Sequence, residues 1–257
     1  MHTIEGVRLT AASVVTGQRK IALDDERAWY GGDQARIERL KKATGLDTRW
    51  VADGGVTAVD LAEQAVRRLA DAGACSPRDI STIIFVTQTP DHFQPCNAAI
   101  LHGRLGLPKA VAAFDLNLGC SGWLYGLCQA ASLVATGAPG PVLLVAGDCL
   151  SRQINPRDRA LAPLFGDAAA ATVVSGDGRR THPADTQNAT SAMHFQHFTD
   201  GGNWTAIRVP GGGSRLPFGS ANADAEPDAE GNWRSELDLF MDGPEVFKFT
   251  LREVPGA

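Results

Sequence analysis

Residues 112–137 read AAFDLNLGCSGWLYGLCQAASLVATG, and this stretch decides the fold class. Residues 112–118 are typical of a strand, and residues 120–137 of a helix that is apolar nearly all round and therefore buried on most faces. Gly119 and Gly122 would let the backbone turn tightly between them and let a substrate approach closely. We therefore expect Cys120 at the end of a strand, where a buried helix begins.

Strand-like and helix-like segments alternate on both sides of this stretch. Apolar residues at helical spacing predict a helix over residues 57–73 and a shorter amphipathic helix over residues 96–106. Apolar runs predict further strands over residues 80–88 and 141–147, and residues 165–175 hold small residues followed by another strand. Strands separated by helices are typical of βαβ units, so we expect an α/β fold with a largely parallel sheet.

The residue composition and the hydrophobic periodicity of the chain change at about Gly178. Gly, Asp, Asn and Pro become frequent, as in GGGSR at 211–215, and the periodicity disappears. We expect residues 1–178 to form an N-terminal α/β part and residues 179–240 to be an irregular excursion near the mouth of the site. Residues 241–257 would start the next part, with a helix over residues 245–254 that has Pro244 at its first position.

The composition of the 257-residue chain argues against several classes of function. With 24 Lys and Arg against 29 Asp and Glu, the net charge is −5, so we expect no nucleic-acid partner. The sequence has no apolar run of about 18 residues, so we expect no membrane span. Five scattered cysteines without CxxC spacing give little support to a disulfide framework or a metal site. We also expect a cytoplasmic location, because the start of the sequence does not resemble a secretory signal.

Cys120 is the candidate nucleophile. Backbone N–H groups at a helix N-terminus stabilise an anion, and a thiolate placed there is a good acceptor for an acyl group from a thioester. The alternative is that Cys120 is a small apolar residue filling a tight helix–sheet contact. A serine nucleophile at Ser121 is weakly supported, since Trp123 stands where the hydrolase motif G-x-S-x-G has its last glycine.

Six short strings, in order along nearly the whole chain, resemble the β-ketoacyl-acyl-carrier-protein synthase III family of the thiolase superfamily. They are Thr44-Gly45-Leu46 with Arg49; Thr87-Gln88-Thr89-Pro90-Asp91 with Pro95; Phe114-Asp115 with Cys120-Ser121-Gly122 and Tyr125; Asp158-Arg159; Phe165-Gly166-Asp167 followed by four alanines; and Met241 with Gly243 and Glu245-Val246-Phe247-Lys248. The resemblance implies a thiolase-like fold layered α-β-α-β-α, of which this chain would supply the N-terminal half.

The resemblance also implies a ping-pong acyl transfer. Cys120 would take an acyl group from acyl-coenzyme A or an acyl-carrier protein. It would then condense this group with malonyl-acyl-carrier protein in fatty acid, specialised lipid or polyketide synthesis. The resemblance implies no cofactor, because the coenzyme A thioester is a substrate. We also expect the protein to form a homodimer or a heterodimer.

Two further groups of residues match family positions. Arg159, Gly243 and Phe247 match positions along the coenzyme A and pantetheine channel, where an arginine suits phosphates. For Arg159 the alternative is a surface ion pair, for example with Asp158. Phe93 and Gln94 match a loop that crosses the dimer interface and limits acyl length. A lone aromatic in such a loop could also be only a packing residue.

The sequence departs from the family pattern in two places. Arg39 and Ala43 replace a tryptophan and an arginine that contact the adenine end in the family. The family's catalytic histidine and asparagine lie in a C-terminal half that we expect this chain to lack. We therefore assign neither catalytic role to a residue of this chain. Two other functions stay open: an acyltransferase that uses an oxygen or nitrogen acceptor without decarboxylation, and a non-catalytic partner subunit of a related synthase.

Overall fold

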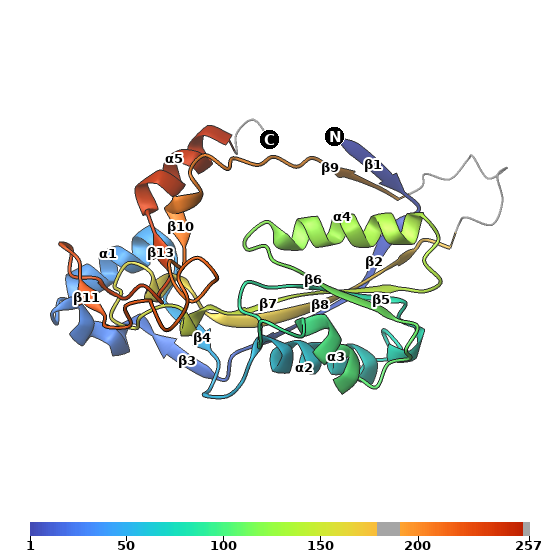
Figure 1. Cartoon of the computed structure of the whole chain (residues 1–257), viewed down its shortest axis with the longest axis horizontal. Helices are drawn as coiled ribbons and strands as arrows, with labels where there is room; N and C mark the ends of the chain where they lie inside the picture. The colour runs from blue at the N-terminus through green and yellow to red at the C-terminus, as the bar shows by residue number, and fades with distance from the viewer. Residues whose placement is uncertain (179–190, 254–257) are drawn as a thin grey trace. The chain divides into compact units, whose positions relative to one another are not determined.

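The computed structural model of the chain describes residues 1–178 and 191–253 (Figure 1). The chain forms two compact units. The first consists of Met1–Gly17, Ala52–Asp148 and Asp167–Gln196, and the second of Gln18–Val51, Cys149–Gly166 and His197–Ala257. The boundaries predicted at 178 and 240 stay predictions, and residues 179–190 of the predicted excursion lie outside the described residues.

The first unit is built on a five-stranded sheet with the strand order β2-β8-β7-β5-β6. The strands are β2 (Val7–Thr16), β8 (Asp167–Gly176), β7 (Val142–Cys149), β5 (Thr82–Val86) and β6 (Ala112–Leu116). β5 pairs in parallel with β6 and with β7, whereas β2 pairs antiparallel with β8. The sheet is therefore mixed: the expected parallel pairing holds for β5 with both of its neighbours, whereas β2 and β8 are antiparallel.

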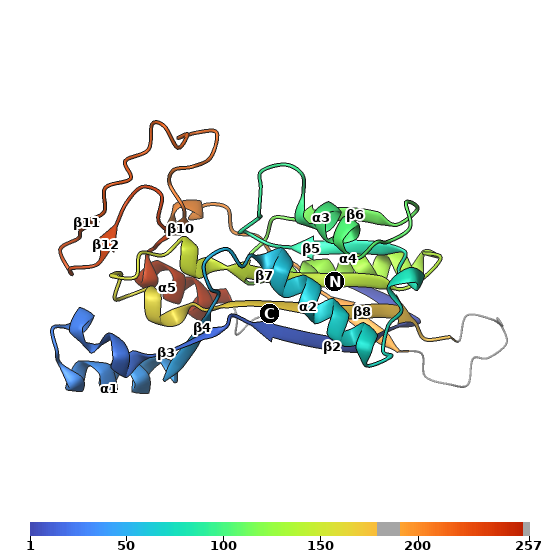
Figure 2. The same ribbon diagram turned by 90° about the horizontal axis from the view of Figure 1, so that it is seen from below.

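Helices cover both faces of this sheet. α2 (Ala58–Asp71) and α3 (Asn97–Arg104) lie on one face, and α4 (Gly122–Ala135) lies on the other (Figure 1). Seen from below, α2 crosses the sheet over β2 and β8 (Figure 2). On the far side of α4, β1 (His2–Glu5) pairs antiparallel with β9 (Ala192–Phe195). The layers within this unit therefore follow the order α, β, α, β.

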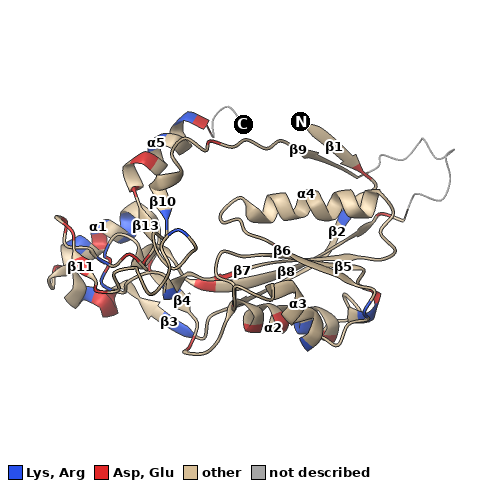
Figure 3. Cartoon of the chain, in the orientation of Figure 1, with Lys and Arg blue, Asp and Glu red and all other residues tan. Residues whose placement is uncertain are grey.

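The local sequence explains the elements of this unit. Thr57 caps α2, because its hydroxyl accepts the Asp60 N–H at 3.4 Å while the Asp60 carboxylate accepts the Thr57 N–H at 2.7 Å. One face of α2 is buried, and all of β5 is buried because layers cover it on both sides. α4 carries no charged side chain, unlike α1 (Gln34–Thr44) of the second unit (Figure 3). Leu124 of α4 is nevertheless 54% exposed, so the expectation that α4 is buried on most faces is wrong at this position.

The described residues of the second unit form short antiparallel pairs and the α-helices α1 and α5 (Gly243–Glu253). β3 (Arg19–Ala22) pairs with β4 (Thr48–Val51), β10 (Ile207–Arg208) with β13 (Phe240–Met241), and β11 (Glu226–Pro227) with β12 (Trp233–Arg234). The predicted terminal helix is α5 (Gly243–Glu253). Short 3-10 helices of the two units span Leu23–Tyr30, Pro77–Asp79, Leu150–Arg152, Ala162–Leu164 and Trp204–Ala206. No helix within residues 1–178 and 191–253 is long and apolar enough to cross a membrane.

Candidate functional site

Cys120 is exposed in the turn between β6 and α4. Ser121 is the N-cap of α4, and its carbonyl accepts the N–H groups of Leu124 at 3.0 Å and Tyr125 at 3.2 Å. The N–H of Gly122 donates to the carbonyl of Gly119 at 2.8 Å, which closes the turn below Cys120. The helix therefore begins two residues later than predicted, and Cys120 precedes the cap.

The glycines at the start of α4 are needed for close packing. A Cβ on Gly122 would collide with Val86 of β5, whereas a Cβ on Gly119 would meet only the flexible end of the exposed Gln88 side chain. Neither glycine has a positive φ, so a special turn conformation is not the reason for them. One turn further along α4, a Cβ on Gly126 would lie 2.5 Å from the Leu144 side chain of β7. These glycines let α4 and the Cys120 turn lie directly against the sheet.

One carboxylate fixes the chain that leaves β5. Oδ1 of Asp148 accepts the hydroxyls of Thr87 and Thr89, each at 2.8 Å. The same oxygen accepts the backbone N–H of Gln88 at 2.8 Å and that of Thr89 at 2.9 Å. Asp148 lies at the end of β7, so it ties the ends of two neighbouring strands together beside the Gln88 side chain that borders Gly119.

The loop that carries Phe93 and Gln94 is anchored on both sides of its tip. Asp91 accepts the Thr57 hydroxyl at 2.8 Å, and its own N–H donates to the side-chain carbonyl of Asn97 at 2.9 Å. Phe93 is 77% exposed, and Gln94 is exposed beside it. The loop therefore presents a large apolar side chain at a constrained position.

Asp115 of β6 joins the end of this loop to the sheet. Its carboxylate accepts the N–H groups of Asn97 at 2.7 Å and Ala98 at 2.8 Å, at the start of α3. Burial raises the pKa of Asp115, although the two N–H groups oppose this effect. Asp115 belongs to the Phe114-Asp115 string of the family resemblance. Its role in the structure is to fix the start of α3 to β6.

Arg159 lies in the second unit and makes a contact that the sequence did not predict. Its guanidinium donates to the carbonyl of Glu230, while its Nε is buried without a hydrogen-bond partner among the described residues. The alternative of an ion pair with Asp158 is wrong, because Asp158 accepts from Arg234 and from the N–H groups of Ala160 and Leu161.

Tyr30 also belongs to the surroundings of Arg159. Its hydroxyl donates to the Arg159 carbonyl at 3.4 Å, and burial raises the pKa of Tyr30 to about 12. Sequence reasoning missed this tyrosine, since a single aromatic beside a polar loop has no periodic signature.

Gly243 and Phe247 lie on α5 of the second unit. Gly243 is its first residue, and an added Cβ there would meet nothing within 4 Å. Phe247 is 63% exposed. Cys120, Phe93 and Gln94 thus belong to the first unit, whereas Arg159, Gly243 and Phe247 belong to the second.

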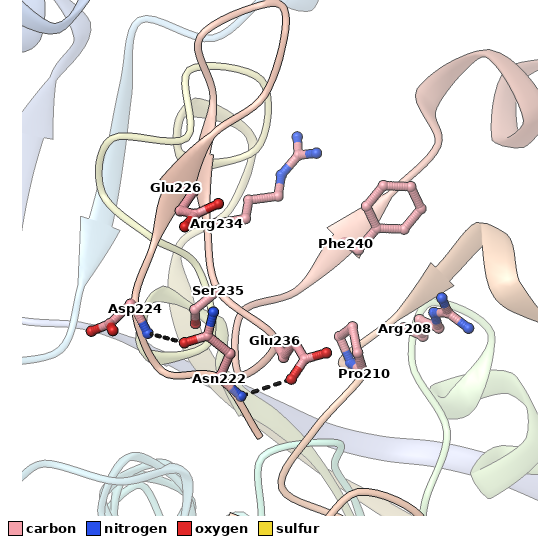
Figure 4. Close-up of a pocket in the computed structure, with 9 residues that line it drawn as sticks. All are labelled: Arg208, Pro210, Asn222, Asp224, Glu226, Arg234, Ser235, Glu236 and Phe240. Carbon is pink, nitrogen blue, oxygen red and sulfur yellow. Dashed lines mark hydrogen bonds between the residues drawn. The ribbon is translucent and has the colours of Figure 1, made fainter. Parts of the chain in front are cut away.

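Two hollows lie within the second unit. The first, of about 250 Å³, has mixed charges on its wall (Figure 4); it is lined by Arg208, Pro210, Asn222, Asp224, Glu226, Arg234, Ser235, Glu236 and Phe240. The second, of about 320 Å³, is mainly apolar, with the Glu26–Arg49 ion pair on its wall. In the part of the chain that the structure describes, no three His, Cys, Asp or Glu side chains are grouped so that they could hold a metal ion.

Comparison with known proteins gives one consistent family. The family model described as 3-Oxoacyl-[acyl-carrier-protein (ACP)] synthase III matches residues 114–196. The putative 3-oxoacyl-[acyl-carrier-protein] synthase 3 of Campylobacter jejuni is 32% identical over 249 residues, and acetoacetyl CoA synthase NphT7 of Streptomyces sp. strain CL190 is 36% identical over 251 residues. A crystal structure of 3-oxoacyl-(acyl-carrier protein) synthase from Burkholderia xenovorans LB400 matches with a TM-score of 0.85 at 32% identity.

The matches also show how much of each relative this chain spans. They cover 96% of the chain for the Campylobacter and Streptomyces proteins and 99% for the Burkholderia structure. The chain corresponds to 67%, 69% and 68% of those proteins, and to 59–61% of several further synthase III relatives. The expectation that it supplies only the N-terminal half is therefore wrong, since it spans about two thirds of its better-covered relatives.

Proposed function

Because the chain belongs to the 3-oxoacyl-[acyl-carrier-protein] synthase III family, we propose that it is a condensing acyltransferase with Cys120 as its nucleophile. The observation that carries this proposal is the exposure of Cys120 in a glycine-lined turn between β6 and α4. A cysteine that only filled a helix–sheet contact would be buried, as Cys149 is. Gly122 lets the start of α4 lie against Val86 of β5, and the exposed Cys120 is accessible to a thioester.

In the first step, the Cys120 thiolate attacks the carbonyl carbon of an acyl thioester. A new C–S bond forms to Cys120, and the donor leaves as a thiolate that takes up a proton. Coenzyme A or a carrier protein is the proposed donor, and the reaction needs no further cofactor. The N-terminus of α4 is one residue beyond Cys120, so its partial positive charge favours the thiolate form.

In the second step, a malonyl thioester loses carbon dioxide, and the electron pair left on its carbon attacks the acyl-Cys120 carbonyl. A carbon–carbon bond forms, the Cys120 sulfur leaves as a thiolate, and the product is a 3-oxoacyl thioester. Malonyl-acyl-carrier protein is the proposed extender substrate. We assign no histidine or asparagine of this chain to the decarboxylation, and we place the reaction in the cytoplasm.

We assign substrate binding to the remaining site residues. Arg159, Gly243 and Phe247 of the second unit would border the channel for coenzyme A and its pantetheine arm. The permanent charge of Arg159 suits a phosphate, and the 63% exposed ring of Phe247 suits the apolar part of the arm.

Phe93 and Gln94 would close the acyl pocket of a second copy in a dimer. The support is the 77% exposure of Phe93 at the tip of a loop that is anchored through Asp91 and Thr57. If Phe93 limits the acyl chain, Phe93→Ala should shift the preferred donor to longer chains. An unchanged preference would make Phe93 a packing residue only.

The test is to measure carbon dioxide release and 3-oxoacyl product from an acyl-coenzyme A with malonyl-carrier protein or malonyl-coenzyme A. The proposal predicts both products in equal amounts, and neither with Cys120→Ala. Acyl transfer to an alcohol or an amine, with no release of carbon dioxide, would support the alternative of a non-condensing acyltransferase. Activity of a related synthase that rises with this chain and survives Cys120→Ala would show a non-catalytic partner subunit.

A further inference from the structure

Gln88 places a carboxamide beside the Cys120 turn, and this group takes no part in the proposed reaction. A Cβ built on Gly119, the residue before Cys120, would overlap Oε1 of Gln88 and would lie 3.7 Å from its Nε2. Gln88 and Cys120 are both exposed. The amide and the thiol therefore border the same turn on an accessible surface of the first unit.

The order of the strands explains why these two residues meet. β5 lies between β7 and β6 and is parallel to both. The chain passes from β5 through α3 to β6, and then through α4, on the opposite face of the sheet, to β7 (Figure 1). Ligands of open α/β sheets bind at the carboxyl end of a strand where successive connections turn to opposite sides. Gln88 follows the end of β5 at this place, and Cys120 follows the end of β6.

The backbone of Gln88 has a fixed position at this edge of the sheet. Its N–H donates to Oδ1 of Asp148 at 2.8 Å. The N–H of the preceding residue, Thr87, donates to the Leu116 carbonyl of β6 at 3.1 Å, which continues the pairing of the two strands. Because the main chain is held on both sides, only the side-chain torsions of Gln88 are free to adjust the amide to a molecule bound at Cys120.

A carboxamide at this place distinguishes between kinds of acyl group. It offers one carbonyl oxygen as an acceptor and two N–H groups as donors, and it carries no charge. A plain alkyl chain would cover these polar groups without bonding to them, which costs free energy. An oxygen on the acyl chain would pair with them instead. Discrimination between two acyl groups then comes from the hydrogen bond that only one of them can make.

We propose that Gln88 is a specificity-determining residue, which favours acyl donors with a hydroxyl or oxo group on the carbon chain close to the thioester. Oε1 of Gln88 would accept a hydroxyl, and Nε2 would donate to an oxo group. Gln88 would contact the acyl group, while Cys120 alone forms a covalent bond to it. This inference rests on the proposed function, because it names the class of acyl group that Cys120 takes up.

The direct test compares butyryl-coenzyme A with the two enantiomers of 3-hydroxybutyryl-coenzyme A, which add one hydroxyl. Intact mass at limiting donor should show acylation of Cys120 about tenfold faster with one hydroxylated donor than with butyryl-coenzyme A, as one hydrogen bond predicts. Gln88→Leu keeps a similar size without the amide, so the preference should disappear. Gln64→Leu, at an exposed glutamine of α2, should keep the preference. Equal rates in the unsubstituted chain, faster reaction of butyryl-coenzyme A, or a preference that survives in Gln88→Leu would each overturn the proposal.

A charge at position 88 tests the placement of the side chain without any acyl donor. In Gln88→Glu, a carboxylate of the same length would border the thiol and disfavour the thiolate. The pH midpoint for alkylation of Cys120 by iodoacetamide should rise by about one unit, while Gln64→Glu leaves it unchanged. An unshifted midpoint in Gln88→Glu would overturn the proposal. If no donor acylates the unsubstituted chain while this midpoint shifts, the proposed function fails although Gln88 borders Cys120, so the two failures are distinguishable.

Discussion

The hydroxyl of Thr87 donates to Oδ1 of Asp148 across 2.8 Å, and this bond links the end of β5 to the end of β7. Thr87 is only 3% exposed, so water cannot easily replace the carboxylate. The same carboxylate oxygen accepts the N–H groups of Gln88 and Thr89. The Gln88 side chain in turn borders Gly119 in the Cys120 turn, so this link supports the proposed nucleophile.

Replacing Asp148 should therefore cost stability. Asp148→Ala removes the acceptor of the buried Thr87 hydroxyl and the carboxylate that the Gln88 and Thr89 N–H groups contact, and we expect it to lower the free energy of unfolding by about 2–3 kcal/mol. Asp148→Asn keeps a carbonyl oxygen and should cost less. Urea unfolding measures both, with the exposed Asp71→Ala as a control that should change stability by less than about 0.5 kcal/mol. A loss in Asp148→Ala no larger than in the control would contradict the role of this bond.

Adding one methyl group to α4 should disturb the Cys120 turn. In Gly122→Ala, the Cβ would collide with Val86 and lie 3.0 Å from Cβ of Leu118, so we expect a loss of about 1–3 kcal/mol and slower acylation of Cys120. Gly103→Ala in α3 is the matched control, because its Cβ would meet nothing within 4 Å. The control should be neutral or stabilising by up to about 1 kcal/mol. Similar thermal unfolding of the two variants would show that α4 does not pack as closely as described.

The Glu26–Arg49 pair should be a strong ion pair of the second unit. Two nitrogens of Arg49 donate to the two carboxylate oxygens of Glu26 at 2.7 and 2.5 Å, and the side chains are only 10% and 15% exposed. Removing either partner alone should cost about 3–5 kcal/mol, because it leaves a buried charge unpaired.

A double-mutant cycle to alanine isolates the interaction between Glu26 and Arg49. We expect a coupling energy above about 1 kcal/mol, against less than about 0.5 kcal/mol for the more exposed helical pair Glu63–Arg67. Equal coupling in the two cycles would contradict the distinction drawn from burial.

Tyr30 should make stability depend on pH in the alkaline range. Burial raises its pKa from 10.0 to about 12 in the folded chain, so the neutral phenol is favoured by folding. This contribution is fully present below about pH 10 and is lost as the pH rises toward about 12. The free energy of unfolding of the unsubstituted chain should therefore fall relative to that of Tyr30→Phe over this interval. A constant difference between the two proteins would show that the phenol is not buried.

The βα units could be predicted from the sequence because local pattern determines them. Helical spacing marks α2, an unbroken apolar run marks β5, and the glycines around Cys120 mark the start of α4 to within two residues. The exposure of the cysteine agrees with its choice as the candidate nucleophile.

The remaining features depend on partners that are distant in the sequence. β2 has a weak alternating pattern, and it becomes a strand because it pairs antiparallel with β8, more than 150 residues further along. Arg159 contacts a backbone carbonyl of Glu230, and Arg157 contacts the ring of Trp233. Contacts of this kind leave no periodic signal, so neither the mixed sheet nor these two side-chain contacts could be predicted before the structure.

Acylation of Cys120 is the step on which the proposed function depends. Intact mass after incubation with a panel of acyl-coenzyme A thioesters tests it directly, with Cys120→Ala and the buried Cys149→Ala alongside. We expect one acyl adduct on the unsubstituted chain and on Cys149→Ala, and none on Cys120→Ala. An adduct that persists in Cys120→Ala, or no adduct with any donor, would contradict it.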